Sequence, residues 1–260
     1  MSWRDAAVDL SAAELLRAWE QATTQHPAQQ ALTLLAAACP EPPAAGFAQM
    51  SIGQRDACLL SMRERLFGTR LTGVARCPHC SEQLELSFDG ADIRSPLLAV
   101  DQTDAPLGPT AAALELHVDG CRVRFRLPNS VDLLAVLDIA DAASLRQELL
   151  HRCVLSVERG GEETPPPDVL PSPLADAVGA AMEAADPQGN VQLALDCPAC
   201  GHHWLQAFDI LTYLWREIDD WAQRTLREVH LLASAYGWSE QEILALSARR
   251  RQLYLEMVLE

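Results

Sequence analysis

Apolar residues recur with the period of an α-helix along the first part of the chain. Each periodic segment opens on a residue that favours a helix start: Ser11, Pro27, and a capping box formed by Ser51 and Gln54. Gly68 follows the third segment, where it can end the helix. The pattern predicts three N-terminal helices, over residues 11–22, 27–38 and 51–67.

Further along, apolar and polar residues alternate with the period of a β-strand. Asp119 and Gly120 separate two of these runs, and Asp-Gly is a strong signal for a hairpin turn. The pattern predicts a strand on each side of two Cys-containing turns and a separate hairpin between them. The alternating runs cover residues 71–75, 84–88, 114–118, 123–127 and 191–195.

The segment between the two Cys-containing turns mixes helical and irregular stretches. We expect two helices capped by Ser130 and Asp141, and an Ala-rich helix near residues 174–185. Residues 100–110 are rich in turn-forming residues, and residues 159–173 hold two glycines and five prolines. Both of these stretches are therefore predicted to be loops or linkers.

Helical periodicity returns at residue 209 and continues almost to residue 260. Gly237 stops a long helix at the position where a left-handed residue is needed. Ser239 opens a short helix and Ser247 opens the last one. The apolar face of that last helix includes Leu253, Tyr254, Met257 and Val258. The sequence therefore predicts an α+β fold that is mostly helical and has a helical C-terminal unit.

The composition fits a globular protein that is strongly acidic, with 49% hydrophobic residues and a formal net charge of −16. The 36 acidic side chains outnumber the 20 basic ones, which opposes binding to nucleic-acid phosphates and to anionic membranes. No apolar run approaches the ~20 residues of a membrane-spanning helix. Met1–Asp5 do not begin a secretory signal. We expect a cytoplasmic protein that binds neither nucleic acid nor membrane.

Two Cys-Pro-x-Cys steps lie 120 positions apart, Cys77 to Cys80 and Cys197 to Cys200. The repeat extends beyond the cysteines, because a Phe-Asp pair follows each step at the same distance. Cys-x-x-Cys turns bring two sulfurs to one zinc ion, and two such turns complete a tetrahedron. The sequence predicts a structural Zn²⁺ site in a split zinc ribbon. The isolated cysteines are expected to be buried hydrophobes; they are Cys39, Cys58, Cys121 and Cys153.

The cysteine steps have two alternative interpretations, a redox site and a catalytic zinc site. A redox role needs the first Cys at a helix N-terminus, whereas the residues after Cys80 resemble a strand. A catalytic zinc needs an open position, and three nearby histidines (His79, His202 and His203) raise that question. Four cysteines fill the ligand shell without them. Because no catalytic motif is present either, we expect no enzymatic activity.

The C-terminal region carries a recognisable pattern, Tyr236-Gly237-Trp238-Ser239-Glu240-x-x-Ile243 followed by Leu246-Ser247-x-x-Arg250-Arg251. It resembles the baseplate hub assembly chaperones and baseplate proteins of contractile phage tails and extracellular contractile injection systems. The resemblance is strongest over residues 205–260, and the cysteine segments are similar to those of the longer, zinc-knuckle members. Residues 1–66 and the middle insertion match only loosely, in the order of elements and in Arg126-Leu127-Pro128.

That resemblance implies a non-enzymatic assembly chaperone or structural component of a baseplate or hub. It implies partners among the baseplate, hub or tube proteins of the same system, with retention in the assembled particle left open. The alternatives are a zinc-ribbon module that binds nucleic acid or regulates transcription, and a metallohydrolase. The expected parts are an N-terminal helical region (1–68), two ribbon halves (69–90 and 190–208), an insertion (91–189) and the C-terminal unit (209–260).

Five C-terminal residues are candidates for partner binding, Tyr236, Trp238, Arg249, Arg250 and Arg251. The arginines fall in the first turn of the last helix, where the helix dipole disfavours cations. They either pair within the chain, with Glu240, Glu242, Asp219 or Asp220, or form a basic contact for a partner. Trp238 either plugs a helix corner or contacts a partner.

Overall fold

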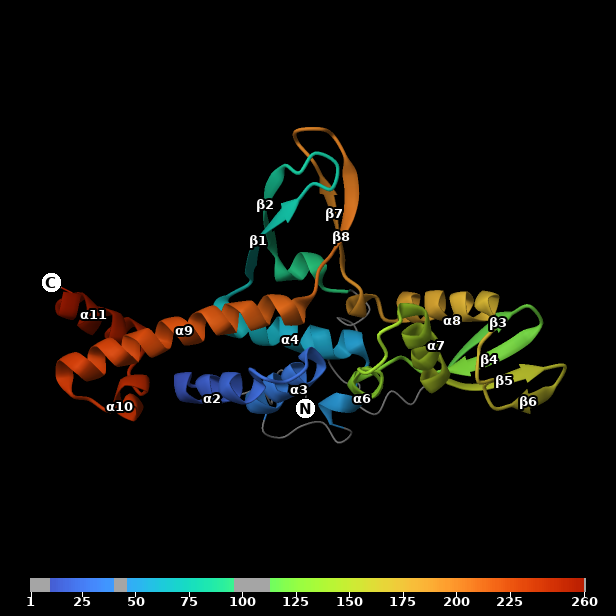
Figure 1. Cartoon of the computed structure of the whole chain (residues 1–260), viewed down its shortest axis with the longest axis horizontal. Helices are drawn as coiled ribbons and strands as arrows, with labels where there is room; N and C mark the ends of the chain where they lie inside the picture. The colour runs from blue at the N-terminus through green and yellow to red at the C-terminus, as the bar shows by residue number, and fades with distance from the viewer. Residues whose placement is uncertain (1–9, 40–45, 96–112, 260) are drawn as a thin grey trace.

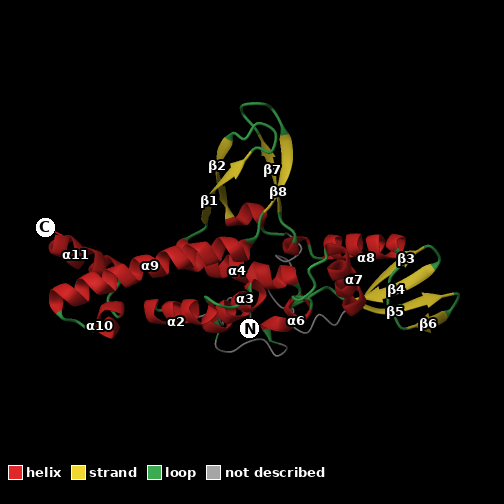
Figure 2. Ribbon diagram, viewed as in Figure 1, coloured by secondary structure: helices red, strands yellow, loops and turns green. Residues whose placement is uncertain are grey.

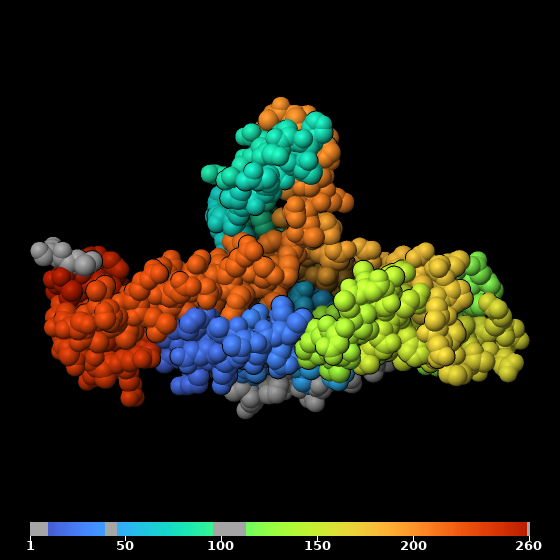
Figure 3. Space-filling view, viewed as in Figure 1, coloured from blue at the N-terminus to red at the C-terminus, as the bar shows by residue number. Residues whose placement is uncertain are grey.

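The computed structural model describes residues 10–39, 46–95 and 113–259 and has an α+β fold (Figure 2). A zinc-ribbon-like pair of hairpins rises from a helical body, an inserted α/β lobe lies at one end, and a helical arm lies at the other (Figures 1 and 3). Met1–Asp5 and the predicted loop over 100–110 lie outside the described residues. Among the residues described, no helix has the length and apolar character needed to cross a membrane.

The helical body brings together segments from the two ends of the chain. It contains α2 (Ala12–Ala22), α3 (Pro27–Ala38), α4 (Ile52–Phe67) and the first half of α9 (Ile210–Tyr236). A short 3₁₀ turn, η1 (Phe47–Gln49), packs beside them. The predicted helix bounds and the capping box of Ser51 and Gln54 are confirmed, and Ser11 caps α2 as expected, forming a second capping box with Glu14. The shared core is mainly Leu-rich and includes Leu15, Leu34, Leu35, Leu59, Leu60, Leu214 and Ile218.

A partly buried ion pair joins α4 to α9 inside this body. The Arg63 guanidinium donates two hydrogen bonds to the Glu217 carboxylate, at 2.7 and 2.8 Å, and a third to the Gly68 carbonyl. Because the carboxylate favours the charged guanidinium, the pKa of Arg63 is raised. The helix that follows the second ribbon hairpin is therefore locked to the helix that precedes the first.

The two ribbon halves are separate antiparallel hairpins. Strand β1 (Arg70–Arg76) pairs with β2 (Gln83–Asp89), and β7 (Gln192–Asp196) pairs with β8 (His203–Ala207). No ladder joins one hairpin to the other among the described residues. The hairpins stand beside each other above α4 and α9 (Figure 1), so the contact between them depends on side chains.

The inserted lobe is a four-stranded antiparallel sheet with two helices against one face. The sheet runs in the order β3 (Leu114–Val118), β4 (Cys121–Phe125), β5 (Val154–Arg159) and β6 (Glu162–Thr164). Helices α7 (Ala142–Cys153) and α8 (Ser172–Ala185) cover it (Figure 1). Its small separate core contains Val123, Phe125, Leu150, Val154, Leu170, Ala175 and Val178.

The sequence reading of this lobe was wrong in two places. Residues 159–173 are not wholly a loop, because Gly160 and Gly161 form the turn of a β5–β6 hairpin at positive φ. Charged residues fill both strands near that turn, so the apolar alternation that marks a strand is missing. Helix α6 (Ser130–Ala135) is capped by Asn129 rather than Ser130, because the Asn129 side chain accepts from the amides of Val131 and Asp132.

Two short 3₁₀ turns join the lobe to the ribbon. The first, η2 (Gly90–Ile93), follows β2, and the second, η3 (Pro187–Gly189), precedes β7. Gln188 holds both connections together, because its side chain accepts from the Ser95 amide and donates to the Ile93 carbonyl. Asp186 also accepts from the Gly53 amide at the start of α4, at 2.8 Å. The ends of the insertion are therefore anchored on the body.

The helical arm is formed by the distal half of α9, α10 (Glu240–Leu244) and α11 (Ala248–Leu259). Gly237 ends α9 at φ 68°, as predicted from the sequence. The predicted apolar face of α11 is only partly correct, because Leu253 and Met257 are exposed. The buried residues of α11 are Arg251 and Leu255, and the half-buried Tyr254 packs against the same core.

Candidate metal centre

The two Cys-Pro-x-Cys turns adopt the same backbone geometry. In the first, the Ser81 amide donates to the Cys77 carbonyl and the Cys77 amide donates to the Glu82 carbonyl, both at 2.9 Å. In the second, Gly201, Cys197 and His202 repeat both bonds at the same distance. The residue after each second cysteine lies at positive φ, 63° for Ser81 and 68° for Gly201. Each turn therefore presents its two sulfurs in the same way.

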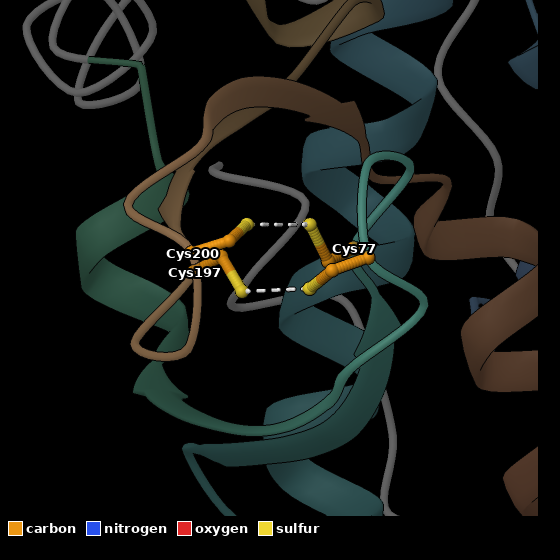
Figure 4. Close-up of side chains that lie close together, drawn as sticks. Cys77, Cys197 and Cys200 are labelled. Atoms are coloured by element: carbon orange, nitrogen blue, oxygen red, sulfur yellow. Dashed lines mark hydrogen bonds between the residues drawn. The ribbon is translucent and has the colours of Figure 1, made fainter.

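The four sulfurs converge between the tips of the hairpins (Figure 4). Their ligand atoms all lie within 4.8 Å of one another. The Cys77 and Cys200 sulfurs are 3.8 Å apart, and the Cys80 and Cys197 sulfurs are 3.5 Å apart. Tetrahedral zinc thiolates, with Zn–S bonds of about 2.3 Å, require sulfurs about 3.8 Å apart. The donor set and its spacing therefore fit a closed, four-sulfur metal site.

Backbone amides favour the thiolate at Cys77 in particular. Burial opposes ionisation of the Cys77 thiol, but the amides of Cys80 and His79 point at its sulfur and the sulfurs of Cys80 and Cys197 lie close by. Together these groups lower the pKa of Cys77 to about 7. At Cys80 the Glu82 amide acts in the same direction, but the neighbouring sulfurs and burial outweigh it and raise the pKa of its thiol to about 12. The thiolate is the form that binds a metal ion, so the turn prepares a ligand before the ion arrives.

The nearby histidines lie beside the sulfur cluster rather than within it. His79 stacks on His202 with ring centroids 5.6 Å apart, and His202 stacks on Trp204 at 6.0 Å. The His203 ring forms a hydrogen bond with the Asp196 carboxylate on the neighbouring strand. The potential metal-ligand cluster found among the described residues consists of the four cysteines. The other four cysteines are buried elsewhere, as expected.

The internal repeat continues below the metal site to the base of the hairpins. The Asp89 side chain accepts from the Ala91 amide and caps η2, whereas Asp209 accepts from the Leu211 amide and caps α9. The duplicated unit therefore comprises a strand, a cysteine turn, a second strand and an Asp-capped helical start. After that first turn the two copies diverge, because one enters the insertion and the other enters the long helix.

One contact at the base was not evident from the sequence. The Tyr213 hydroxyl donates to the Thr72 carbonyl at 2.8 Å and accepts from the Thr72 amide at 3.0 Å. These bonds satisfy one residue on the open edge of β1. Tyr213 is the fourth residue of α9, so this contact orients the first hairpin on the helix that follows the second.

The candidate partner residues lie on the arm, far along α9 from the ribbon (Figure 1). Arg251 is buried, donating to the Glu228 carboxylate at 3.0 Å and to the Leu246 carbonyl at 2.8 Å. Its partner is therefore none of the four carboxylates weighed from the sequence. Arg249 and Arg250 are exposed. Trp238 is half-buried and stacks on Tyr236.

Comparison with known proteins assigns the chain to a family. Residues 10–215 match the family described as T4 bacteriophage base plate protein. No curated protein and no solved structure matches the chain. The match covers the body, the ribbon and the inserted lobe, although the resemblance read from the sequence was strongest over residues 205–260. Since the match spans most of the sequence, the chain belongs to the T4 bacteriophage base plate protein family.

Proposed function

We propose that this protein is a non-enzymatic assembly chaperone or structural component for the baseplate or hub of a contractile tail-like injection system. The family match over residues 10–215 carries the proposal, because family membership indicates a structural role with other baseplate components. The shape agrees with such a role. The ribbon, the inserted lobe and the arm extend from one helical body in different directions (Figures 1 and 3), and each would present its own surface to baseplate components.

We further propose that the four cysteines bind a structural Zn²⁺ ion. Cys77 and Cys80 would supply two thiolates from one hairpin, and Cys197 and Cys200 would supply two from the other. The bound ion would contribute folding free energy by tying the hairpins together, since no strand ladder joins them in the described part of the chain. The ribbon would thereby position the insertion and α9 on the body.

The proposed partners are baseplate, hub or tube proteins of the same injection system, met in the cytoplasm during assembly. The formal charge of −16 disfavours nucleic acid as a general partner. A gel-shift experiment with duplex DNA at low and physiological salt distinguishes the assembly role from the alternative, a zinc-ribbon module that binds nucleic acid. Salt-dependent binding at micromolar protein would favour the nucleic-acid module over the assembly role.

The assembly role is tested by deleting the gene and inspecting the particles by electron microscopy. We expect sheaths or tubes without complete baseplates, and complementation by the wild-type chain should restore them. Mass spectrometry of purified wild-type particles then separates the two forms of the proposal. A retained component is present at a fixed ratio, whereas a chaperone is absent. Normal particles in the deletion strain would contradict both forms.

A further inference from the structure

An apolar patch occupies the end of the arm, and it is made by Tyr236, Trp238, Leu253, Tyr254 and Met257. Trp238 stacks on Tyr236 with ring centroids 4.7 Å apart and meets Tyr254 edge-on at 4.9 Å. Leu253 and Met257 continue the patch along α11, since residues three and four positions apart share one helix face. We call this surface the arm patch.

Tyr236, Leu253 and Met257 form the exposed side of the arm patch, whereas Trp238 and Tyr254 also pack against the core of the arm. Arg251, Leu255 and Ile243 already fill the inner side, packed with residues of α9. By contrast, Met257 is 64% exposed, Leu253 47% and Tyr236 39%. Contiguous exposed apolar side chains of this kind mark interaction surfaces. The residue types agree, because Tyr, Trp, Met and Arg are enriched in protein interfaces.

The charge around the arm patch identifies the sign of its partner. Arg249 and Arg250 are exposed at the N-terminus of α11, a helix of 12 residues whose dipole adds positive potential there. Of the nearby carboxylates, Glu228 pairs with Arg251, Glu242 accepts at the Ser239 cap and Glu256 accepts from Gln252, whereas Glu240 is exposed on α10. Residues 221–260 carry equal numbers of arginines and acidic residues, so the whole charge of −16 lies in residues 1–220.

We infer that the arm patch docks an acidic segment of a baseplate partner whose apolar side chains cover Trp238, Tyr254 and Met257 while its carboxylates face Arg249 and Arg250. This inference rests on the proposed function and specifies its surface. A second copy of the chain is a poorer occupant, because two molecules of charge −16 repel each other. The partner's acidic groups would meet the part of this molecule that lacks excess negative charge.

The test uses the full-length chain and the purified baseplate, hub and tube proteins of its own system as probes. Each probe is titrated by biolayer interferometry against wild type, Met257→Ser and the double variant Arg249→Glu/Arg250→Glu. Val169→Ser is the matched apolar control, since Val169 is 69% exposed in the inserted lobe. Arg17→Glu, at an exposed position of α2, is the charge control.

We expect both arm variants to raise the Kd for one probe roughly tenfold or more, with the controls unchanged. Wild-type binding should also weaken between 50 and 300 mM NaCl, because exposed charges are screened by salt. Circular dichroism and metal content should match wild type for every variant, since the substituted side chains are exposed.

Three results would overturn the inference. If a probe binds all variants equally, the arm patch is not the docking surface, but the proposed function stands. If no probe binds wild type, the proposed function itself fails. If sedimentation shows self-association of wild type that the arm variants abolish, the patch is an interface between copies of this chain.

Discussion

Phe88 and Phe208 meet edge to face, with ring centroids 5.7 Å apart, although 120 positions separate them in the sequence. Phe88 lies near the end of β2 and Phe208 directly follows β8, and each precedes the aspartate that caps the next helical turn. The pair closes the base of the ribbon, whereas the cysteines close its tip. The two halves are therefore held at both ends by side chains that occupy equivalent positions of the internal repeat.

Replacing either phenylalanine should weaken this base. We expect Phe88→Ala or Phe208→Ala to lower the free energy of unfolding by roughly 2 kcal/mol, less than the ~3–5 kcal/mol of a fully buried ring. In a double-mutant cycle the two changes should couple by roughly 0.5–1.5 kcal/mol, because the rings contact each other. Urea unfolding measures each value. The control combines Phe88→Ala with Phe125→Ala, at a ring in the core of the inserted lobe, and the two losses of stability should simply add. If the losses at Phe88 and Phe208 also add without coupling, the contact between the rings contributes nothing.

The cysteine site should control both metal content and stability. Cys77→Ser or Cys197→Ser removes one of four thiolates, and we expect zinc content to fall from one equivalent towards zero with loss of solubility and assembly. Plasma mass spectrometry and thermal unfolding measure the two effects. Cys121→Ala, at a buried cysteine in the inserted lobe, should keep the full zinc content. Wild-type zinc content and stability in both ligand variants would rule out the site.

Gly53 should be irreplaceable for a steric reason. A Cβ at this position would overlap the Asp186 carboxylate and lie 2.9 Å from the Gly189 amide nitrogen. Because Asp186 also accepts from the Gly53 amide, Gly53→Ala would push the end of the insertion away from α4. We expect a loss of roughly 1–3 kcal/mol of stability by urea unfolding. The matched control is Gly73→Ala in β1, where a Cβ meets open space and stability should hold; equal losses at both sites would contradict this account.

Asp132 should make the stability of the inserted lobe depend on pH in the acidic range. Burial alone raises the pKa of this carboxyl, but hydrogen bonds from Arg126 and from the Asn129 amide, with the charge of Arg152, lower it below its ordinary value of 3.8. A lowered folded-state pKa contributes stability that is complete above pH 3.8 and is lost as the pH falls through the folded value. At pH 7, we expect Asp132→Asn to reduce stability by about 3 kcal/mol, because two guanidinium groups lose their buried partner.

The pH series provides the check on this prediction. The difference between wild type and Asp132→Asn should shrink below pH 3.8, where the wild-type carboxyl takes up a proton. Asp176→Asn is the control, since its ion pair with Arg146 lies at the surface and contributes only ~0–1 kcal/mol. A difference that stays constant from pH 7 to pH 3 would exclude an ionised Asp132 as its cause.

Local chemistry alone determined much of this protein. The sequence predicted the cap at Ser11, the capping boxes at Ser51 and Ser239, the left-handed Gly237 and the repeated cysteine turns, because each depends on residues within a few positions of one another. The sequence also predicted that the four cysteines lie close together, since two turns of identical spacing suit one tetrahedral ion.

Tertiary structure decided what local pattern could not. The β5–β6 hairpin was not predicted, because the strand residues beside its turn are charged and show no apolar alternation. The ion pair between Arg251 and Glu228 was not predicted either, because the two residues lie on different helices. The apolar spacing of α11 indicated a buried face, yet neighbouring helices bury Arg251 and Leu255, cover Tyr254 in part and leave Met257 exposed. Periodicity reports which residues share a face, and only packing determines whether another element of the chain covers that face.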